Sequence, residues 1–338
     1  MAINLPPKSD ESFLQRQLRE IIVNKQDFEK IIKIKEGVYN EVKSWSSLKL
    51  IFLNYVAHVY ASIMKNQRYY HDKYFYVDLF AGSGIGKVTD NKNDLIFGSP
   101  LLIATQNKFV KMYFCDINND YIKALEERLK GLNIPENKFS VYSEDCNSAT
   151  DKIISEVKSG HSLIFIDPLG MEIKWKTMEK ILQLNADIII NFQTPSIPRA
   201  RQKNNIGTVM TDFFKNKEDV ERIYQTAIHE GTLGERLLHL YIKDIQDTWL
   251  KYKDSLIVEK IPIKKGDNRF YYDLIFLTRK TANGSPWMQT IKNAGDAIER
   301  LDSKIVQQVL NVLNGRQETI RMTLLKKLSG FLPTKKSS

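Results

Sequence analysis

The sequence has few cysteines and no cysteine pattern. Its 338 residues include only two, Cys115 and Cys146. Two cysteines are too few for a disulfide framework to organise the fold, and this usage is typical of a protein in a reducing compartment. Neither lies in a Cys-x-x-Cys arrangement, and the five histidines are scattered. The sequence therefore predicts a cytoplasmic protein without a metal site.

Long apolar runs are also missing. No segment approaches the roughly 18 consecutive apolar residues that indicate a membrane span, and the N-terminal stretch MAINLPPKSDESFLQRQ lacks the apolar core of a secretory signal. With 42% hydrophobic and 27% charged residues, the chain has the composition of a globular protein that buries a full core. Its length suits one large α/β domain with additions, or two small domains.

Positive charge is concentrated at one end of the chain. The net charge is +10, and residues 261–338 contain 14 basic and 6 acidic side chains, so this stretch carries +8 of the total. A basic region suits a phosphate backbone because each neutralised phosphate releases counterions. A solvated basic tail is the alternative interpretation. We expect nucleic acid, DNA or RNA, to be the partner.

Strand and helix patterns alternate through the middle of the chain. KYFYVDLF is an apolar run without polar alternation, as in parallel strands buried on both faces. Four more strand patterns follow with helical patterns between them: MYFCDI, FSVYSED, LIFIDPLG and ADIIINFQ. This alternation implies right-handed crossovers and a mainly parallel sheet. The predicted fold class is α/β and Rossmann-like.

Three regions are expected. Residues 1–70 form an N-terminal helical segment that packs on the core, and they include an amphipathic stretch at 11–38. Residues 71–200 form the Rossmann-like core. Residues 201–338 contain a helical insertion, late strands of the sheet and basic C-terminal helices. Within this last region, VEKIPIKKGDNRFYYDLIFLT is consistent with a hairpin that turns at residues 266–268.

A glycine-rich turn follows the first strand of the core. Asp78 and Phe80 lead into it, and Gly82, Gly84 and Gly86 stand at alternate positions. Without Cβ atoms the backbone can adopt positive φ and approach a ligand closely. The GxGxG spacing differs from the GxGxxG dinucleotide fingerprint, and an acid before the turn suits a cation better than a phosphate. S-adenosylmethionine, with its ammonium and sulfonium, fits these features; a purely structural turn is the alternative.

Two more acids stand at strand ends. Asp116 follows a strand, where a carboxylate can accept hydrogen bonds from ribose hydroxyls. Helix capping is its alternative role, although Asn118 or Asn119 can cap that helix instead. Asp145 is placed to meet the adenine amine, with Cys146 as an adjacent backbone donor. Because the carboxyl ends of parallel strands line one crevice, these acids and the glycine turn together predict the cofactor site.

The fourth strand ends in Asp167-Pro168-Leu169-Gly170, where the methyl acceptor is expected. Amino-group methyltransferases carry an Asp/Asn-Pro-Pro-aromatic tetrad there. Its first side chain and a Pro-fixed carbonyl accept hydrogen bonds from the target amine, and its aromatic ring stacks on the base. Asp167 and Pro168 keep the first half as candidate catalytic residues, whereas Leu169 and Gly170 lack the second. A turn fixed by proline is the alternative.

Other residues then have to complete the acceptor site. Phe192 or Trp175 is expected to supply the stacking ring. Arg199 can reach a phosphate or carboxylate, or it is an ordinary surface arginine. Ser99-Pro100 predicts the next helix start, with Ser99 as its cap. Residues 87–98 are thus predicted to form an inserted loop at the mouth of the site, either a lid or a passive surface loop.

Together these motifs resemble the three-Cys-motif partner proteins (TcmP). The resemblance covers most of the chain and includes the segments WSSLKLIFLNY, DLFAGSG, GSP at 98–100, FIDPLG, ADIIINF and YYDLIFLT, followed by Gly284 and Trp287-Met288. It implies a class I methyltransferase-like fold and a partner protein with three clustered cysteines that looks like a radical-type iron–sulfur enzyme.

The function that we expect is methylation of nucleic acid, at a base amine, with S-adenosylmethionine as the cofactor. The alternative is a non-catalytic adaptor with the same fold, because half of the acceptor tetrad is missing. A nicotinamide dehydrogenase is disfavoured by the glycine spacing and by Asp78.

Overall fold

The computed structural model describes residues 25–193, 206–227, 232–264, 270–280 and 286–299, together with residues 306, 309, 310, 313 and 314. The predicted contact of Arg199, the N-terminal part of the amphipathic stretch and most of the basic C-terminal region lie outside the described residues.

Seven strands of the described chain form one large sheet, in the order β6-β5-β2-β7-β8-β10-β9. Five neighbouring strands pair in parallel with one another: β2 (Tyr74–Asp78), β5 (Lys111–Asp116), β6 (Phe139–Ser143), β7 (His161–Ile166) and β8 (Ala186–Phe192). β10 (Phe270–Thr278) is antiparallel to both β8 and β9 (Ile257–Lys264), so it is the one reversed strand of this sheet. The predicted fold class, an α/β fold with a mainly parallel, Rossmann-like sheet, is confirmed.

The strand order places the ligand crevice. From β2 the chain proceeds outward to β5 and β6 on one side, and then returns to β7 and β8 on the other. The order therefore reverses between β2 and β7. In open α/β sheets, ligands bind beyond the carboxyl ends of the strands at such a reversal. Asp78 ends β2 and Asp167 directly follows β7, so the two predicted halves of the site meet at this point.

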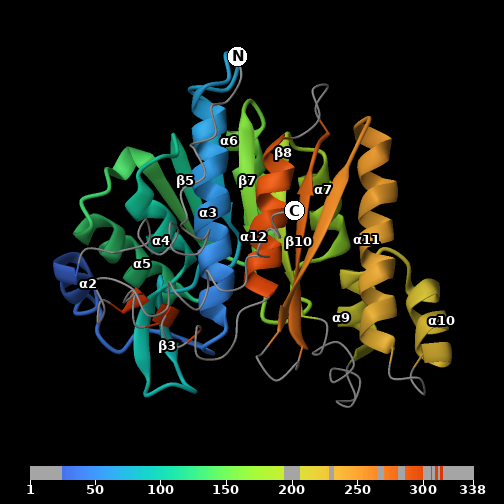
Figure 1. Cartoon of the computed structure of the whole chain (residues 1–338), viewed down its shortest axis with the longest axis horizontal. Coiled ribbons are helices and arrows are strands. Elements are labelled where there is room, and N and C mark those ends of the chain that lie inside the picture. Colours follow the sequence, from blue (N-terminus) through green and yellow to red (C-terminus); the bar gives the residue numbers. More distant parts are fainter. Residues whose placement is uncertain are drawn as a thin grey trace, which may run out of the picture.

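Helices cover both faces of the sheet (Figure 1). One hydrophobic cluster lies under α3 (Ser46–Lys65), α4 (Ser99–Gln106), α5 (Asn119–Gly131) and α12 (Pro286–Glu299). The other lies under α6 (Cys146–Val157), α7 (Trp175–Leu182), α9 (Ile206–Phe213), α10 (Lys217–Ala227) and α11 (Leu233–Tyr252). Successive side chains of a strand serve opposite faces: Tyr76 belongs to the first cluster and Val77 to the second. Both faces of the central strands are thus buried, as their uninterrupted apolar runs predict.

α3 is the long apolar helix that precedes the first strand of the core. By length and composition it could cross a membrane, but 61% of its most apolar window is buried inside the protein. It lies across one face of the sheet in Figure 1, with Ile51, Phe52, Leu53 and Val56 fully buried. Packing on the sheet therefore accounts for its apolar sequence.

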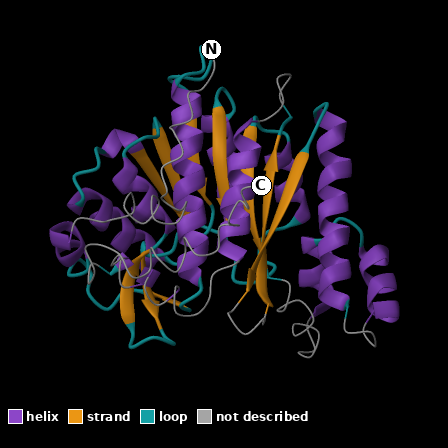
Figure 2. Cartoon of the chain, in the orientation of Figure 1, coloured by secondary structure: helices purple, strands orange, loops and turns teal. Residues whose placement is uncertain are grey.

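A second, three-stranded sheet lies below the large one in Figure 2. It consists of β1 (Asn40–Val42), β3 (Ile85–Val88) and β4 (Asp94–Phe97), with β1 parallel to β3 and β4 antiparallel to it. The prediction of an inserted loop at residues 87–98 is therefore wrong. The segment is most of a β-hairpin, turned by the positive φ of Lys92 and Asn93. Its strands are only four residues long, too short for a periodic pattern to stand out.

The predicted helix starts are confirmed at α5 and only partly at α4. Asn118 caps α5, because its side chain accepts hydrogen bonds from the backbone N–H groups of residues 120 and 121. α4 begins at Ser99 with Pro100 in its first turn, as predicted, but its cap is Gly98 without a side-chain hydrogen bond. The Ser99 hydroxyl donates to Asp78 instead. The hairpin of β9 and β10 is also confirmed; its turn lies outside the described residues.

Candidate functional site

The glycines after β2 are required by neighbouring side chains of the protein itself. Gly82 and Gly84 have φ values of +61° and +80°, which strain any other residue. A Cβ on Gly82 would clash with the side chain of Asn40, and one on Gly84 would lie 2.8 Å from Cγ of Leu101. Gly86 is not part of the turn: it lies inside β3 and packs against β1. The sequence assigns the space beside the Gly82 Cα to a cofactor. In the structure the side chain of Asn40 occupies it.

Hydrogen bonds hold the turn in place. The Gly82 N–H donates to Asp116 Oδ2 at 2.9 Å, and the Ser83 N–H donates to Asn40 Oδ1 at 2.6 Å. The Ser83 carbonyl accepts from Nη1 of Arg128, at 2.8 Å. Arg128 is fully buried and also donates to the carbonyl of Ile34. Burial lowers the pKa of Arg128 to about 10, so it remains a cation at neutral pH.

Asp78 lies beneath the turn. Its side chain is 0% exposed, and it accepts hydrogen bonds from Ser99 Oγ at 2.6 Å, from the Phe80 N–H at 3.2 Å and from the Tyr76 hydroxyl at 3.3 Å. Burial raises the pKa of Asp78 to about 7, against the opposing effect of the Ser99 hydrogen bond. The carboxyl group thus ties the glycine turn to the start of α4. Direct contact with a ligand, as the sequence predicts for Asp78, would require the turn to open. Phe80 is half-buried and packs against the α7–α11 face.

Asp116 lies at the end of β5, beside the turn. It is half-buried and accepts hydrogen bonds from the N–H groups of Gly82 and Asn118. Burial raises the pKa of this carboxyl. Ile117 comes next, and its side chain is 72% exposed. A carboxylate can accept hydrogen bonds from ribose hydroxyls, and an exposed apolar side chain beside it can pack against the face of the attached base. The sequence did contain this signal, an apolar residue directly after a strand-end acid, but Ile117 was not predicted.

Asp145 and Cys146 lie at the start of α6. Asp145 is exposed and caps the helix by accepting from the Asn147 N–H at 2.9 Å. Its other carboxylate oxygen accepts no hydrogen bond within the described chain, so it can meet a ligand. The Cys146 side chain is buried, and burial raises the pKa of its thiol to about 12. The backbone N–H of Cys146, and not its thiol, is therefore what can serve the ligand contact that the sequence predicts.

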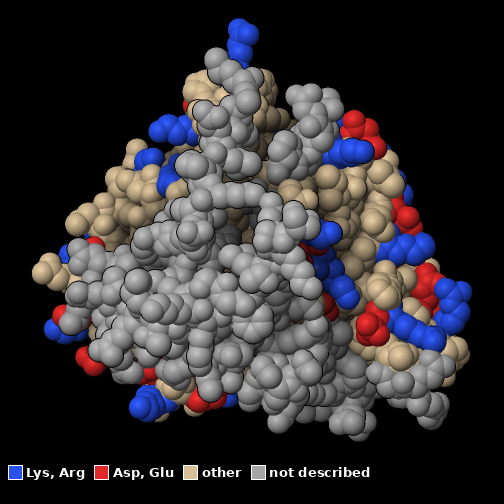
Figure 3. All heavy atoms as spheres, in the orientation of Figure 1, with Lys and Arg blue, Asp and Glu red and all other residues tan. Residues whose placement is uncertain are grey.

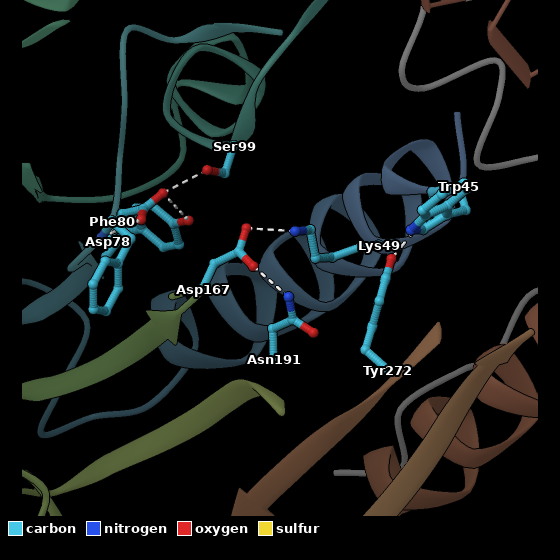
Figure 4. A network of polar contacts seen from close by, with 9 residues as sticks. Trp45, Lys49, Asp78, Phe80, Ser99, Asp167, Asn191 and Tyr272 are labelled. Atoms are coloured by element: carbon cyan, nitrogen blue, oxygen red, sulfur yellow. Dashed lines mark hydrogen bonds and ion pairs between the residues drawn. The ribbon is translucent and has the colours of Figure 1, made fainter. Parts of the chain in front are cut away.

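Asp167 follows β7 and is held by two side chains (Figure 4). Its Oδ2 pairs with Nζ of Lys49 in α3 at 2.5 Å, and its Oδ1 accepts from Nδ2 of Asn191 in β8 at 2.6 Å. The Lys49 and Asp167 side chains are 11% and 19% exposed. Nζ of Lys49 also lies 5.7 Å from the ring centre of Tyr272. Lys49 was not predicted, although it is the one lysine inside an otherwise apolar segment of α3.

The remaining predicted residues of the acceptor site separate into buried and exposed groups. Phe192 and Trp175 both point into the core, where each ring packs against Tyr241. Neither offers a ring face to the crevice, so the prediction that one of them stacks on a substrate base is wrong. Pro168 is buried. Leu169 is 88% exposed and is the apolar side chain that projects beside Asp167.

No group of three or more His, Cys, Asp or Glu side chains that could hold a metal ion occurs in the described part of the chain. The candidate site consists of strand-end carboxylates, the buried Lys49 and the exposed aliphatic side chains of Ile117 and Leu169.

No family model matches the chain, and no curated protein matches its sequence. Among solved structures, a Legionella pneumophila protein of the DUF519 family is 12% identical with a TM-score of 0.43, over 80% of this chain and 93% of that one. An rRNA methylase from Streptococcus thermophilus is 14% identical with a TM-score of 0.34, over 67% and 95%. An O-methyltransferase from Streptomyces achromogenes, solved with S-adenosylmethionine, is 5% identical with a TM-score of 0.36, over 76% and 99%.

These similarities are too distant to transfer a substrate or a residue's role. The resemblance to the three-Cys-motif partner proteins stays a prediction.

Proposed function

We propose that the chain is an S-adenosylmethionine-dependent methyltransferase. The observation that carries this proposal is the position of Asp116: a half-buried carboxylate that accepts from the glycine turn and precedes the exposed Ile117. Each Asp116 oxygen accepts one hydrogen bond from the chain, and each keeps a second lone-pair direction for ribose hydroxyls. Ile117 would contact adenine, and Asp145 would accept from the adenine amine. The donor set fits the cofactor.

The chain's own residues act by binding and orientation. When bound, S-adenosylmethionine would supply an electrophilic methyl group. The acceptor nitrogen would take this methyl group, the sulfur would keep the electron pair of the broken carbon–sulfur bond, and the amine would release one proton to solvent. Asp167 would hold the amine in line with the methyl group at about 3 Å. Asp167 accepts the amine N–H hydrogen bond, and the buried Pro168 keeps the chain rigid after β7.

The acceptor that we propose is a base amine of DNA or RNA. Support comes from Asp167-Pro168, which matches the first half of the amino-methyltransferase tetrad, and from the excess of basic residues at 261–338. On the face shown in Figure 3, the described Lys and Arg side chains are interspersed with Asp and Glu. The charge argument therefore rests on the C-terminal sequence. A base within a duplex would have to be flipped out, at a cost of a few kcal/mol.

Two measurements test this function. Titration calorimetry with S-adenosylmethionine should give saturable binding, and transfer of a tritiated methyl group should be detected on DNA or RNA. Asp167→Ala should lower kcat by about a hundredfold or more, with cofactor affinity unchanged because Asp167 lies on the acceptor side of the crevice. Unchanged cofactor affinity also reports that the variant is folded. Full activity in Asp167→Ala would contradict the role of Asp167, and absence of cofactor binding in the wild type would contradict the function.

A specific observation favours a second candidate, an adaptor without transfer activity. The tetrad is half missing, and the described residues place no predicted ring there: Leu169 is exposed where stacking is needed, and Phe192 and Trp175 are both buried. In that case the partner would be the three-cysteine iron–sulfur protein that the resemblance implies. Cofactor binding without transfer to any DNA, RNA or protein acceptor would favour the adaptor.

A further inference from the structure

The ion pair between Lys49 and Asp167 has hydrogen-bonding capacity that the protein does not use. An ammonium carries three N–H donors. One donates to Asp167 Oδ2, and the ring of Tyr272 lies 5.7 Å away. Among the described residues, Asp167 is the one hydrogen-bond acceptor that Nζ of Lys49 contacts. The side chain of Lys49 is 11% exposed, so its remaining donors are left for water or for a ligand.

Asp167 is in the complementary situation. A carboxylate offers about four acceptor positions, and Lys49 and Asn191 take one on each oxygen. The amide of Asn191 is oriented by this contact, which leaves its own buried Oδ1 without a partner among the described residues. The carboxylate is thus fixed in position, and its side chain is 19% exposed. Donor and acceptor capacity therefore stand side by side at the carboxyl end of β7.

A purely structural role explains this pair poorly. Removing two charges from water is costly, and replacing a buried ion pair with apolar residues of similar volume is often neutral or stabilising. α3 is apolar around Lys49, with Leu48, Leu50 and Ile51 all buried, so an apolar side chain would suit this position. A ligand that receives hydrogen bonds from Lys49 and donates them to Asp167 accounts for both charges.

We infer that Lys49 and Asp167 together recognise a donor–acceptor edge of the methyl acceptor. Asp167 accepts from the exocyclic amine, and Lys49 donates to the unprotonated ring nitrogen beside it. On the Watson–Crick edge, the edge that we assign to this contact, adenine and cytosine carry an unprotonated ring nitrogen beside the amine, whereas guanine carries a ring N–H there. Enzymes that act on extruded bases read this edge through hydrogen bonds. The inference rests on the proposed function, and it narrows the substrate to adenine or cytosine.

Deaza bases test the Lys49 contact directly. In 1-deazaadenine and 3-deazacytosine, the ring nitrogen beside the amine is replaced by C–H and the amine remains. The probes are matched oligonucleotides with the natural or deaza base at the methylated position. For the wild type, kcat/KM should fall by about tenfold or more on the deaza probe, the loss expected for one hydrogen bond from a charged donor. Lys49→Met should lose a similar factor on the natural base and nothing further on the deaza probe.

Binding gives a second readout that does not require turnover. Fluorescence anisotropy with S-adenosylhomocysteine present should give the same non-additive pattern in Kd. Lys49→Arg, which keeps the charge and the donors, should recover part of the discrimination, and Lys65→Met, on the exposed last turn of α3, should behave like the wild type.

Two results would overturn the inference: an equal deaza penalty in wild type and Lys49→Met, or methylation of guanine. A wild type that methylates no nucleic acid would instead refute the proposed function, on which the inference depends.

Discussion

At the scale of single residues, the buried carboxyl of Asp78 has the clearest measurable consequence. Its pKa is raised by burial from 3.8 to about 7. The folded protein therefore binds a proton that the unfolded chain has lost at intermediate pH. This contribution to stability is complete below about pH 4, and it is lost as the pH rises through about 7.

Asp78→Asn should therefore flatten the pH dependence of the free energy of unfolding. The asparagine amide stands in for the protonated acid, so the variant should not lose the up to about 4 kcal/mol that the wild type loses between pH 4 and pH 8. Urea unfolding at both pH values measures the difference. Some slope should remain, because burial also raises the pKa of Asp187 to about 7. Parallel curves for variant and wild type would contradict a buried, proton-binding Asp78.

Residue types at strand ends could be predicted from sequence, but their contacts could not. Asp116, Asp145 and Asp167 were located correctly because parallel strands fix where their carboxyl ends meet. Lys49 lies 118 residues before Asp167, and no local pattern reports such a pairing. The glycines show the same limit. Their spacing indicated a turn, but only the fold reveals that Asn40 and Leu101 are what make a Cβ impossible there.

At the scale of elements, the glycine turn depends on Arg128 of α5. Its guanidinium joins the Ser83 carbonyl to the carbonyls of Ile34 and Lys35, so it fastens the turn to the segment that leads into β1. Strands with long apolar runs were predicted, and this small sheet was not, because β1 has only three residues and no periodic pattern. Its position depends on contacts that are distant in sequence.

Arg128→Met should loosen this junction. The variant leaves several carbonyls without donors, and we expect a loss of about 2–4 kcal/mol in the free energy of unfolding. Affinity for S-adenosylmethionine should fall as well, because the turn loses its support. Arg128→Lys keeps the charge but cannot reproduce the planar fork, so it should recover only part of both. Thermal unfolding and calorimetry measure the two effects; an unchanged melting temperature in Arg128→Met would show that the turn is held by other contacts.

At the scale of the whole molecule, cofactor binding and nucleic-acid binding are predicted to depend on different parts of the chain. The crevice belongs to the sheet, whereas the excess positive charge belongs to the C-terminal sequence. Because phosphate contacts release counterions, the logarithm of the binding constant should fall linearly with the logarithm of salt concentration, by about 0.9 per contact on duplex DNA. The basic residues should thus be detectable as a salt slope that is separate from cofactor affinity.

Neutralising Lys326, Lys327, Lys335 and Lys336 with glutamine tests this separation. The slope should decrease by up to about 3.6 on duplex DNA if all four contact phosphates, while affinity for S-adenosylmethionine stays the same. A matched control replaces four exposed lysines elsewhere, at 65, 158, 176 and 251, which lowers the net charge equally. Anisotropy titrations over a range of salt concentrations measure both slopes. An equal decrease in the two variants would mean that overall charge, and not a C-terminal contact surface, attracts nucleic acid.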